Sequence, residues 1–208
     1  MRSLIVLVLA SAALLGGCDK QSAAPAQPQQ TPTPLASNGS AALPPSTEGL
    51  PGPHEQGLLV RTHAGQPLPT ADFLGLNGKG ITLVRFKGRP ILLNLWATWC
   101  GPCVLEMPTL DKLAQAQADK LQVITISQDL KGSAQVGPWW AEHKPVLLQP
   151  YTDPENHMLA GINGGDVGAG SLPTTVLYDK DGKEVWRMLG AMDWQSPRSQ
   201  ELLAEAVK

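Results

Sequence analysis

The chain has 208 residues, a formal net charge of -2 and only 16% charged residues, and it contains 21 glycines and 19 prolines. This length allows one or two domains with a sizeable core. The near-neutral charge gives no indication of a nucleic-acid partner, and the many prolines in the first third of the chain indicate a linker there.

The first residues have the features of a secretion signal. Arg2 is followed by an apolar run over residues 4–15, which is too short to span a bilayer comfortably. Leu15-Gly16-Gly17 then precedes Cys18, an order that resembles the lipobox of bacterial lipoproteins. We expect a signal peptide over residues 1–17 and a diacylated Cys18, with Asp19 favouring retention on the periplasmic side of the inner membrane. An uncleaved anchor with an incidental Cys18 is the alternative.

Residues 18–57 are expected to be a disordered tether, because they contain almost no large apolar side chain to bury. The globular domain is expected over residues 58–208. Its patterns predict strands over residues 81–84, 91–96, 121–126, 174–178 and 184–189, and a further strand or extended piece over 146–148. They predict helices over residues 102–118, 135–144, 158–162 and 200–207. Asp179-Lys180-Asp181-Gly182 predicts a hairpin between the last two strands, and this order of elements is typical of an α/β fold with a mixed sheet.

The sequence Trp99-Cys100-Gly101-Pro102-Cys103 closes the apolar run 91–96 and begins a helical pattern. The unpaired N–H groups at a helix start favour a thiolate, and the thiolate is the nucleophile of disulfide exchange. We predict Cys100 as the attacking thiolate and Cys103, one turn further on, as the resolving thiol. A structural or metal-binding pair is the alternative.

A metal site is not expected. One CxxC pair supplies only two ligands, and no second pair with finger spacing follows. The four histidines share no common spacing; they are His54, His63, His143 and His157.

Glu106 is the carboxylate to which the helical spacing draws attention. It shares a face with Cys103, Leu110 and Leu113. A carboxylate on an apolar face is costly unless it has a task or a partner. We therefore expect Glu106 to have a task or a partner, the alternative being a carboxylate that favours the N-terminal half of its helix.

These motifs together resemble the TlpA/ResA-like thiol-disulfide oxidoreductases of the thioredoxin superfamily, from about Pro67 to the C-terminus. The motifs that carry the resemblance are the run 94–103, Glu106-Met107-Pro108, Leu172-Pro173-Thr174-Thr175, Asp181-Gly182-Lys183 and the tail Gly190-Ala191-Met192-Asp193-Trp194. The resemblance implies a thioredoxin fold with an added N-terminal β-hairpin over residues 58–84. It also implies an insertion before the proline loop, at about residues 132–162.

The resemblance also implies roles for individual residues. Asn94 stands where thioredoxins proper usually carry a buried Asp, which leaves Glu106 as the acid and base. Pro173 matches the cis-proline that faces the disulfide, an ordinary trans turn proline being the alternative. Substrate contacts are expected from Trp99, Gly101, Pro102, Leu172 and Pro173, whereas Trp96 is expected in the core.

The function implied is that of a membrane-tethered protein-disulfide reductase with no cofactor beyond the Cys100–Cys103 disulfide. The family implies oxidised apocytochrome c or copper-assembly proteins of cytochrome oxidase as substrates, and a membrane electron donor of the DsbD/CcdA type. Alternatives are a thiol oxidase or isomerase on the same fold, or a non-catalytic copper chaperone.

Overall fold

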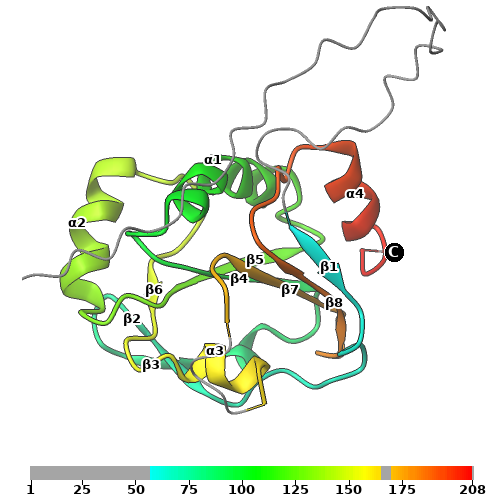
Figure 1. Ribbon diagram of the computed structural model, residues 1–208, viewed down its shortest axis with the longest axis horizontal. Helices are drawn as coiled ribbons and strands as arrows, with labels where there is room; N and C mark the ends of the chain where they lie inside the picture. Colours follow the sequence, from blue (N-terminus) through cyan, green and yellow to red (C-terminus); the bar gives the residue numbers. More distant parts are fainter. Residues whose placement is uncertain (1–56, 165–169, 208) are drawn as a thin grey trace, which may run out of the picture. The chain divides into compact units, whose positions relative to one another are not determined.

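The computed structural model describes residues 57–164 and 170–207, which form a mixed sheet with helices on both faces (Figure 1). The strand order in this eight-stranded sheet is β1-β8-β7-β4-β5-β6-β2-β3. The strands are β1 Leu58–Val60, β2 Asp72–Gly75, β3 Gly80–Thr82, β4 Ile91–Trp96, β5 Gln122–Ser127, β6 Tyr151–Thr152, β7 Thr174–Tyr178 and β8 Glu184–Leu189. The helices are α1 Gly101–Ala116, α2 Ser133–His143, α3 His157–Ile162 and α4 Pro197–Leu203, with a 3-10 helix at Leu83–Phe86. This arrangement confirms the predicted α/β thioredoxin class, while the predicted signal peptide and nearly all of the tether lie outside the described residues.

Strand β4 lies at the centre of the sheet, parallel to β5 on one side and antiparallel to β7 on the other. All its residues are buried, which is typical of a strand that is covered on both faces. Leu92 and Trp96 pack into the core with α1, whereas Leu93 and Leu95 pack into the core on the opposite face with α3. Because side chains alternate along a strand, Asn94 points toward α1.

Helix α1 begins directly after Cys100, whose Sγ accepts a hydrogen bond from the N–H of Cys103 at 3.3 Å. Pro102 fits in the first turn because N–H groups there have no acceptor within the helix. The helix continues through Pro108 to Ala116. Its buried face includes all four residues that the helical spacing selects, namely Cys103, Glu106, Leu110 and Leu113.

Residues 58–84 do not form a single hairpin. Strand β1 pairs with β8 at one edge of the sheet, whereas β2 and β3 pair with each other at the opposite edge. Between them, Gly65 adopts a positive φ of 86° that turns the chain, and Pro67 and Pro69 offer no N–H to a strand ladder. The expected N-terminal hairpin is therefore confined to residues 72–82.

The expected insertion contains α2, β6 and α3. Residues 146–148 form no strand, because the N–H groups of Val146, Leu147 and Leu148 donate instead to the carboxylate of Asp111, at 2.9, 2.9 and 3.1 Å. Burial raises the pKa of Asp111, but these hydrogen bonds and one from Gln115 outweigh it, so the pKa lies below its usual value. The insertion is thus fastened to α1.

The last helix begins earlier than its apolar pattern predicts. Ser196 caps α4 by accepting a hydrogen bond from the N–H of Ser199 at 3.2 Å, and Pro197 occupies the first turn. Helix α4 then ends at Leu203. In the part of the chain that the structure describes, no helix is both long and apolar enough to cross a membrane.

Candidate redox site

A disulfide joins Cys100 and Cys103 at the beginning of α1. The S–S distance is 2.06 Å and the Cα–Cα distance is 5.3 Å. Cys100 is 6% exposed, whereas Cys103 is completely buried. The two cysteines therefore differ in accessibility, and a macromolecular partner reaches Cys100 before Cys103.

The turn that precedes the disulfide is held by the buried carboxylate of Asp129. The N–H and hydroxyl of Thr98 donate to it at 2.9 and 2.8 Å, and the hydroxyl of Ser127 donates at 2.7 Å. The amide of Gln135 on α2 adds a hydrogen bond to the Thr98 hydroxyl at 2.9 Å. Since Asp129 follows β5, these bonds tie together the carboxyl ends of the two central parallel strands.

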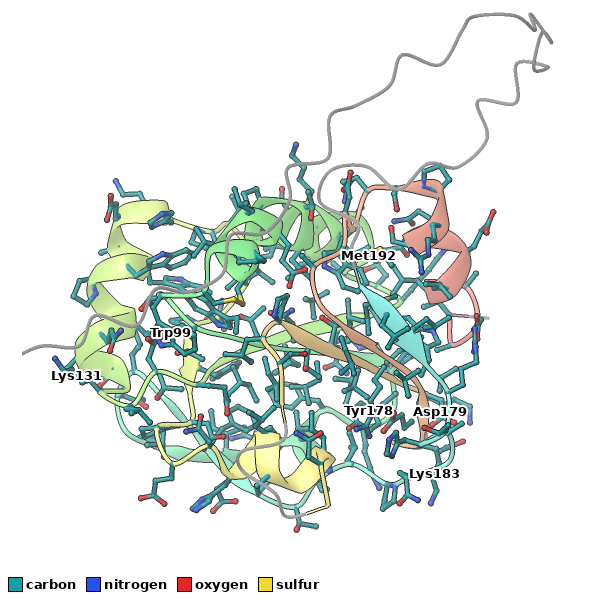
Figure 2. All side chains as sticks on the ribbon, in the orientation of Figure 1. Trp99, Lys131, Tyr178, Asp179, Lys183 and Met192 are labelled. Carbon is teal, nitrogen blue, oxygen red and sulfur yellow. A yellow bond between two sulfur atoms is a disulfide. The ribbon has the colours of Figure 1, made fainter. Side chains whose placement is uncertain are left out.

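The tryptophans of the motif have opposite environments, as the sequence predicts. Trp96 is completely buried and packs against Trp139, with ring centroids 4.7 Å apart. Trp99 is 66% exposed and lies on the α2 side of the molecule (Figure 2). Gly101 and Pro102 are exposed beside it, so they form the surface around the disulfide together with Trp99.

The proline loop lies directly before β7. The Leu172–Pro173 peptide bond is cis, and the carbonyl of Pro173 accepts a hydrogen bond from the N–H of Gly190 at 2.8 Å. Leu172 and Cys100 line the same cavity. The loop is therefore anchored to the end of β8 and borders Cys100.

Glu106 is a buried carboxyl group, 3% exposed, one turn beyond Cys103 on the same helix face. Its Oε1 accepts a hydrogen bond from Asn94 Nδ2 at 2.7 Å, and its Oε2 accepts one from the N–H of Met192 at 3.1 Å. Burial raises the pKa of Glu106 to about 7, against the opposing effects of Met192, Asn94 and Trp194. The indole N–H of Trp194 has no hydrogen-bond partner of ordinary geometry, so we attribute its effect to proximity. Both protonation states of Glu106 are accessible near neutral pH.

Cys100 thus lies directly before α1, and the completely buried Cys103 and a titratable carboxyl group lie within the first two turns of that helix. Residues 63–203 of this chain match the Redoxin family. The chain belongs to that family.

Several proteins are similar to this chain. This Redoxin chain is 35% identical over 128 residues to the thioredoxin-like protein YneN of Bacillus subtilis, covering 59% of this chain and 69% of YneN. It is 32% identical over 127 residues to the thiol-disulfide oxidoreductase ResA of Bacillus anthracis, covering 61% of this chain and 69% of ResA. It is 33% identical over 150 residues to the thiol:disulfide interchange protein DsbE of Pseudomonas aeruginosa, covering 68% of this chain and 78% of DsbE. The protein is a thiol-disulfide oxidoreductase of the TlpA/ResA-like type.

Solved structures show the same fold. The exposed lipoprotein thioredoxin Etrx1 of Streptococcus pneumoniae superposes with a TM-score of 0.54 at 28% identity, covering 65% of this chain and 98% of that chain. A secreted thiol-disulfide isomerase of Corynebacterium glutamicum gives a TM-score of 0.55 at 23% identity, covering 67% of this chain and 83% of the isomerase. The second likeness concerns the fold alone.

Several residues around the Redoxin site were missed by sequence reasoning. Gln128 and Asp129 border it, and Met192 contributes its N–H to Glu106 from 86 positions away. The polar run Ser127-Gln128-Asp129 at the end of an apolar strand is a usable signal, because the carboxyl ends of parallel strands converge at one edge of a sheet. No comparable signal marks the contact of Met192.

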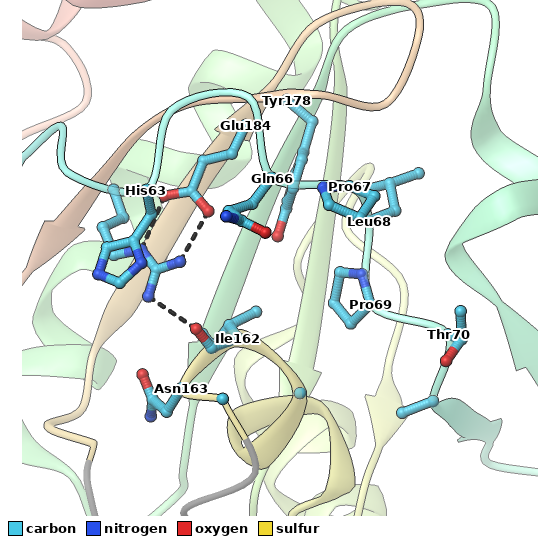
Figure 3. A pocket seen from close by; sticks show the side chains of 14 residues that line it. His63, Gln66, Pro67, Leu68, Pro69, Thr70, Ile162, Asn163, Tyr178 and Glu184 are labelled. Carbon is cyan, nitrogen blue, oxygen red and sulfur yellow. Dashed lines mark hydrogen bonds and ion pairs between the residues drawn. The ribbon is translucent and has the colours of Figure 1, made fainter.

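A second cavity, of about 610 Å³, lies where β7 ends and β8 begins, at the end of these strands that is farther from the proline loop (Figure 3). Glu184 and Arg187 form a buried ion pair there, with two hydrogen bonds of 2.7 Å, and Arg187 also donates to the carbonyl of Ile162 at 2.8 Å. These bonds use both carboxylate oxygens and all three guanidinium nitrogens. The ion pair therefore fastens α3 to β8, and we assign it a structural role.

The remaining predicted positions lie away from the disulfide or outside the described residues. Cys18 and His54 belong to the latter group. His143 stacks on Trp139 with ring centroids 3.9 Å apart, and His157 pairs with Glu155 at the surface. Among residues 57–164 and 170–207, no three His, Cys, Asp or Glu side chains are grouped to hold a metal ion.

Proposed function

We propose that this thiol-disulfide oxidoreductase is a protein-disulfide reductase. The observation that carries the proposal is the buried carboxyl group of Glu106, with a pKa raised to about 7, one turn beyond the buried Cys103. In the reduced protein, a resolving thiol in this position must lose its proton before it can act, and a carboxylate of this pKa is suited to accept it.

The reaction begins with the reduced pair. The Cys100 thiolate attacks one sulfur of the substrate disulfide, so that a mixed disulfide forms and a substrate thiolate leaves. Glu106 accepts the proton of the Cys103 thiol, and the Cys103 thiolate attacks Cys100 Sγ. The second substrate sulfur then leaves as a thiolate, and both substrate thiolates take up protons. The protein ends as the observed disulfide, and a membrane electron donor of the DsbD/CcdA type would return two electrons to it.

The direction of electron flow is tested by the reduction potential of the Cys100–Cys103 pair, equilibrated against glutathione. A potential near that of thioredoxin, roughly -270 mV, supports a reductase. A potential near that of a strong oxidant, roughly -120 mV, would overturn the proposal in favour of a thiol oxidase.

We further propose that lipid on Cys18 holds the domain on the periplasmic side of the inner membrane. The support is the apolar run 4–15 with Leu15-Gly16-Gly17 before the cysteine. A solved structural relative is itself described as an exposed lipoprotein. Radiolabelled palmitate should be incorporated into the full chain and not into Cys18→Ser, and equal labelling of both would exclude this anchor.

For the substrate, the TlpA/ResA resemblance favours oxidised apocytochrome c or a copper-assembly protein of cytochrome oxidase. The two are separated by comparing kcat/KM for reduction of an oxidised haem-attachment peptide with that for an oxidised copper-site domain. If the protein is a general reductant, neither substrate will be reduced faster than insulin, and the role in cytochrome maturation will have to be abandoned.

A further inference from the structure

A cavity of about 270 Å³ lies between α1 and the C-terminal end of α2. Its apolar walls come from both helices and from the segment that follows α2, and they include Val104, Met107, Pro108, Trp139 and Pro145. It shares no lining residue with the separate cavity that borders Cys100. We name it the α1–α2 cavity.

Apolar side chains are also exposed to water around the α1–α2 cavity. Val146 is 69% exposed and Leu147 is 44% exposed, and both directly follow Pro145 of the cavity wall in the chain. Leu105 is 61% exposed and shares the outer face of α1 with Lys112. Exposed apolar side chains that gather around a cavity are typical of a surface that a partner covers.

Two lysines line the same cavity. Neither Lys112 nor Lys144 forms an ion pair with another residue that the structure describes. Among the described lining residues, the one carboxyl group belongs to Asp111, which already accepts hydrogen bonds from three backbone N–H groups and from Gln115. The cavity is therefore apolar inside and offers two unpaired cations to an anionic partner.

Lys144 occupies its position at a cost in backbone conformation. Its φ of 46° and ψ of 56° are left-handed, at the end of α2. Glycine or asparagine usually occupies such a position, because other side chains clash with the backbone there. The other described non-glycine residue with a positive φ is indeed an asparagine, Asn156. Since no ion pair within the described chain offsets the cost at Lys144, its side chain points to a role outside folding.

We propose that the α1–α2 cavity docks an acidic segment of a partner polypeptide, with one bulky apolar side chain inside the cavity and carboxylates paired with Lys112 and Lys144. Met107 and Trp139 in the wall favour an aromatic side chain, because sulfur–aromatic and aromatic–aromatic contacts are favourable. The removal of this side chain from water supplies affinity, and the two ion pairs supply orientation. A phospholipid surface fits less well, since two lysines attract an anionic membrane only weakly. The proposal goes beyond the redox function and does not depend on it.

The test is the binding of fluorescein-labelled peptides, capped at both ends, to the oxidised full chain. The first peptide carries Phe with two Glu on each side, the second replaces Phe with Ala, and the third replaces every Glu with Lys. We expect the Phe–Glu peptide to bind on the order of tenfold more tightly than the Ala–Glu peptide, and the Phe–Lys peptide not to bind. Fluorescence anisotropy measures the dissociation constants. Absence of saturable binding of the Phe–Glu peptide, or binding of either other peptide with equal affinity, would overturn the proposal.

Lys144→Gly separates docking from folding, because glycine relieves the left-handed backbone and removes the cation. We expect the thermal midpoint not to fall, and the Phe–Glu peptide to bind on the order of threefold more weakly. Lys131→Ala is the matched control, since Lys131 is also exposed but does not line the α1–α2 cavity. Equal affinities in the two variants, or a lowered thermal midpoint with unchanged affinity in Lys144→Gly, would show that Lys144 does not serve docking.

Two further measurements locate the bound peptide. Trp99→Ser alters the surface beside the disulfide and should leave the affinity for the Phe–Glu peptide unchanged. An equal loss of affinity in Trp99→Ser and Lys144→Gly would instead place the peptide at the redox site and refute the proposal.

Dihexanoylphosphatidylglycerol, a water-soluble anionic phospholipid, serves as the competitor. We expect it to displace the Phe–Glu peptide only at concentrations far above the dissociation constant of the peptide. Displacement below that constant would identify the α1–α2 cavity as a lipid site and would also refute docking of a polypeptide.

Discussion

The amide of Asn94 in the central strand donates a hydrogen bond of 2.7 Å to the carboxyl group of Glu106 on the helix that carries the disulfide. The same nitrogen also donates to the hydroxyl of Thr175 at 2.9 Å, and Thr175 is the register partner of Asn94 across β4 and β7. Because the amide cannot titrate, the proton chemistry of this buried site falls to Glu106 alone. Asn94 sets how readily that carboxyl group ionises.

Removing the Asn94 donor should therefore raise the pKa of Glu106 above its value of about 7, since the hydrogen bond favours the ionised form. In Asn94→Ala, we expect the carboxyl ¹³C resonance of Glu106 in the oxidised protein to titrate at higher pH. Thr175→Val is the matched control, because Thr175 contacts Asn94 and makes no hydrogen bond to Glu106. An unchanged titration in Asn94→Ala would show that the donor does not control this group.

The buried carboxyl group should also make the stability of the oxidised protein depend on pH. The pKa of Glu106 is about 7 in the folded chain and about 4.5 in the unfolded chain, so the folded chain binds the proton more tightly between these values. The contribution to the free energy of unfolding is fully present below the unfolded pKa, and it is lost as the pH rises through the folded pKa, by on the order of 3 kcal/mol. Glu106→Gln should flatten the fall in urea-unfolding free energy between pH 5 and pH 8. The exposed Glu142→Gln serves as control, and an unaltered slope in Glu106→Gln would contradict the assignment.

The pH dependence of the catalytic steps should also depend on Glu106. If Glu106 accepts the proton of Cys103, Glu106→Gln will slow the resolution of a preformed mixed disulfide at Cys100. Its rate will then follow the ionisation of the thiol alone and no longer that of a carboxyl group. Stopped-flow measurement of resolution between pH 5 and pH 9 tests this. The role as base is refuted if the profile of the variant coincides with that of the unsubstituted protein.

The unequal exposure of the two sulfurs predicts different consequences for their substitution. Cys100→Ser should abolish insulin reduction, because Cys103 is buried out of reach of a macromolecular substrate. Cys103→Ser should retain attack and accumulate a covalent complex that mass spectrometry detects and dithiothreitol releases. Turnover retained in Cys100→Ser, or covalent complexes formed through Cys103, would reverse the assignment.

The buried ion pair at the far end of β8 should matter for stability and leave the redox chemistry unchanged. Arg187→Met leaves Glu184 buried without its cation, which typically costs about 3–5 kcal/mol of unfolding free energy. Arg61→Met removes a cation from a partly exposed pair with Glu205, where the loss should not exceed about 1 kcal/mol. Urea unfolding measures both, and the alkylation rate of Cys100 in the reduced variants should match that of the unsubstituted protein. Similar losses of stability in the two variants would argue against the structural role of the Glu184–Arg187 pair.

Local signals were sufficient for much of the fold. The buried strand Ile91–Trp96, the hairpin strands Thr174–Tyr178 and Glu184–Leu189, and the buried face of α1 follow from apolar patterns and turn residues within a few positions of one another. The segment around Val146 could not be predicted in the same way. Its apolar composition resembles a strand, but its N–H groups donate to Asp111, which lies on α1.

The candidate site shows the same division. The spacing of Cys103 and Glu106 placed both on one helix face, and the structure brings Asn94 to that carboxyl group. The contact from Met192 depends on how distant segments meet. It could not be inferred from spacing, because a backbone donor leaves no pattern in the sequence.

The carboxylate of Asp111 limits how this scaffold can be shortened by protein engineering. It accepts hydrogen bonds from three consecutive backbone N–H groups that belong to the insertion, and it is itself only 8% exposed. A minimal variant that deletes α2 and the segment after it would strip this carboxylate of those donors, and it would also remove the contacts of Gln135 with Thr98 and of Trp139 with Trp96. Such a deletion therefore has to be paired with an apolar replacement at position 111, or with a substitute loop that supplies the three donors.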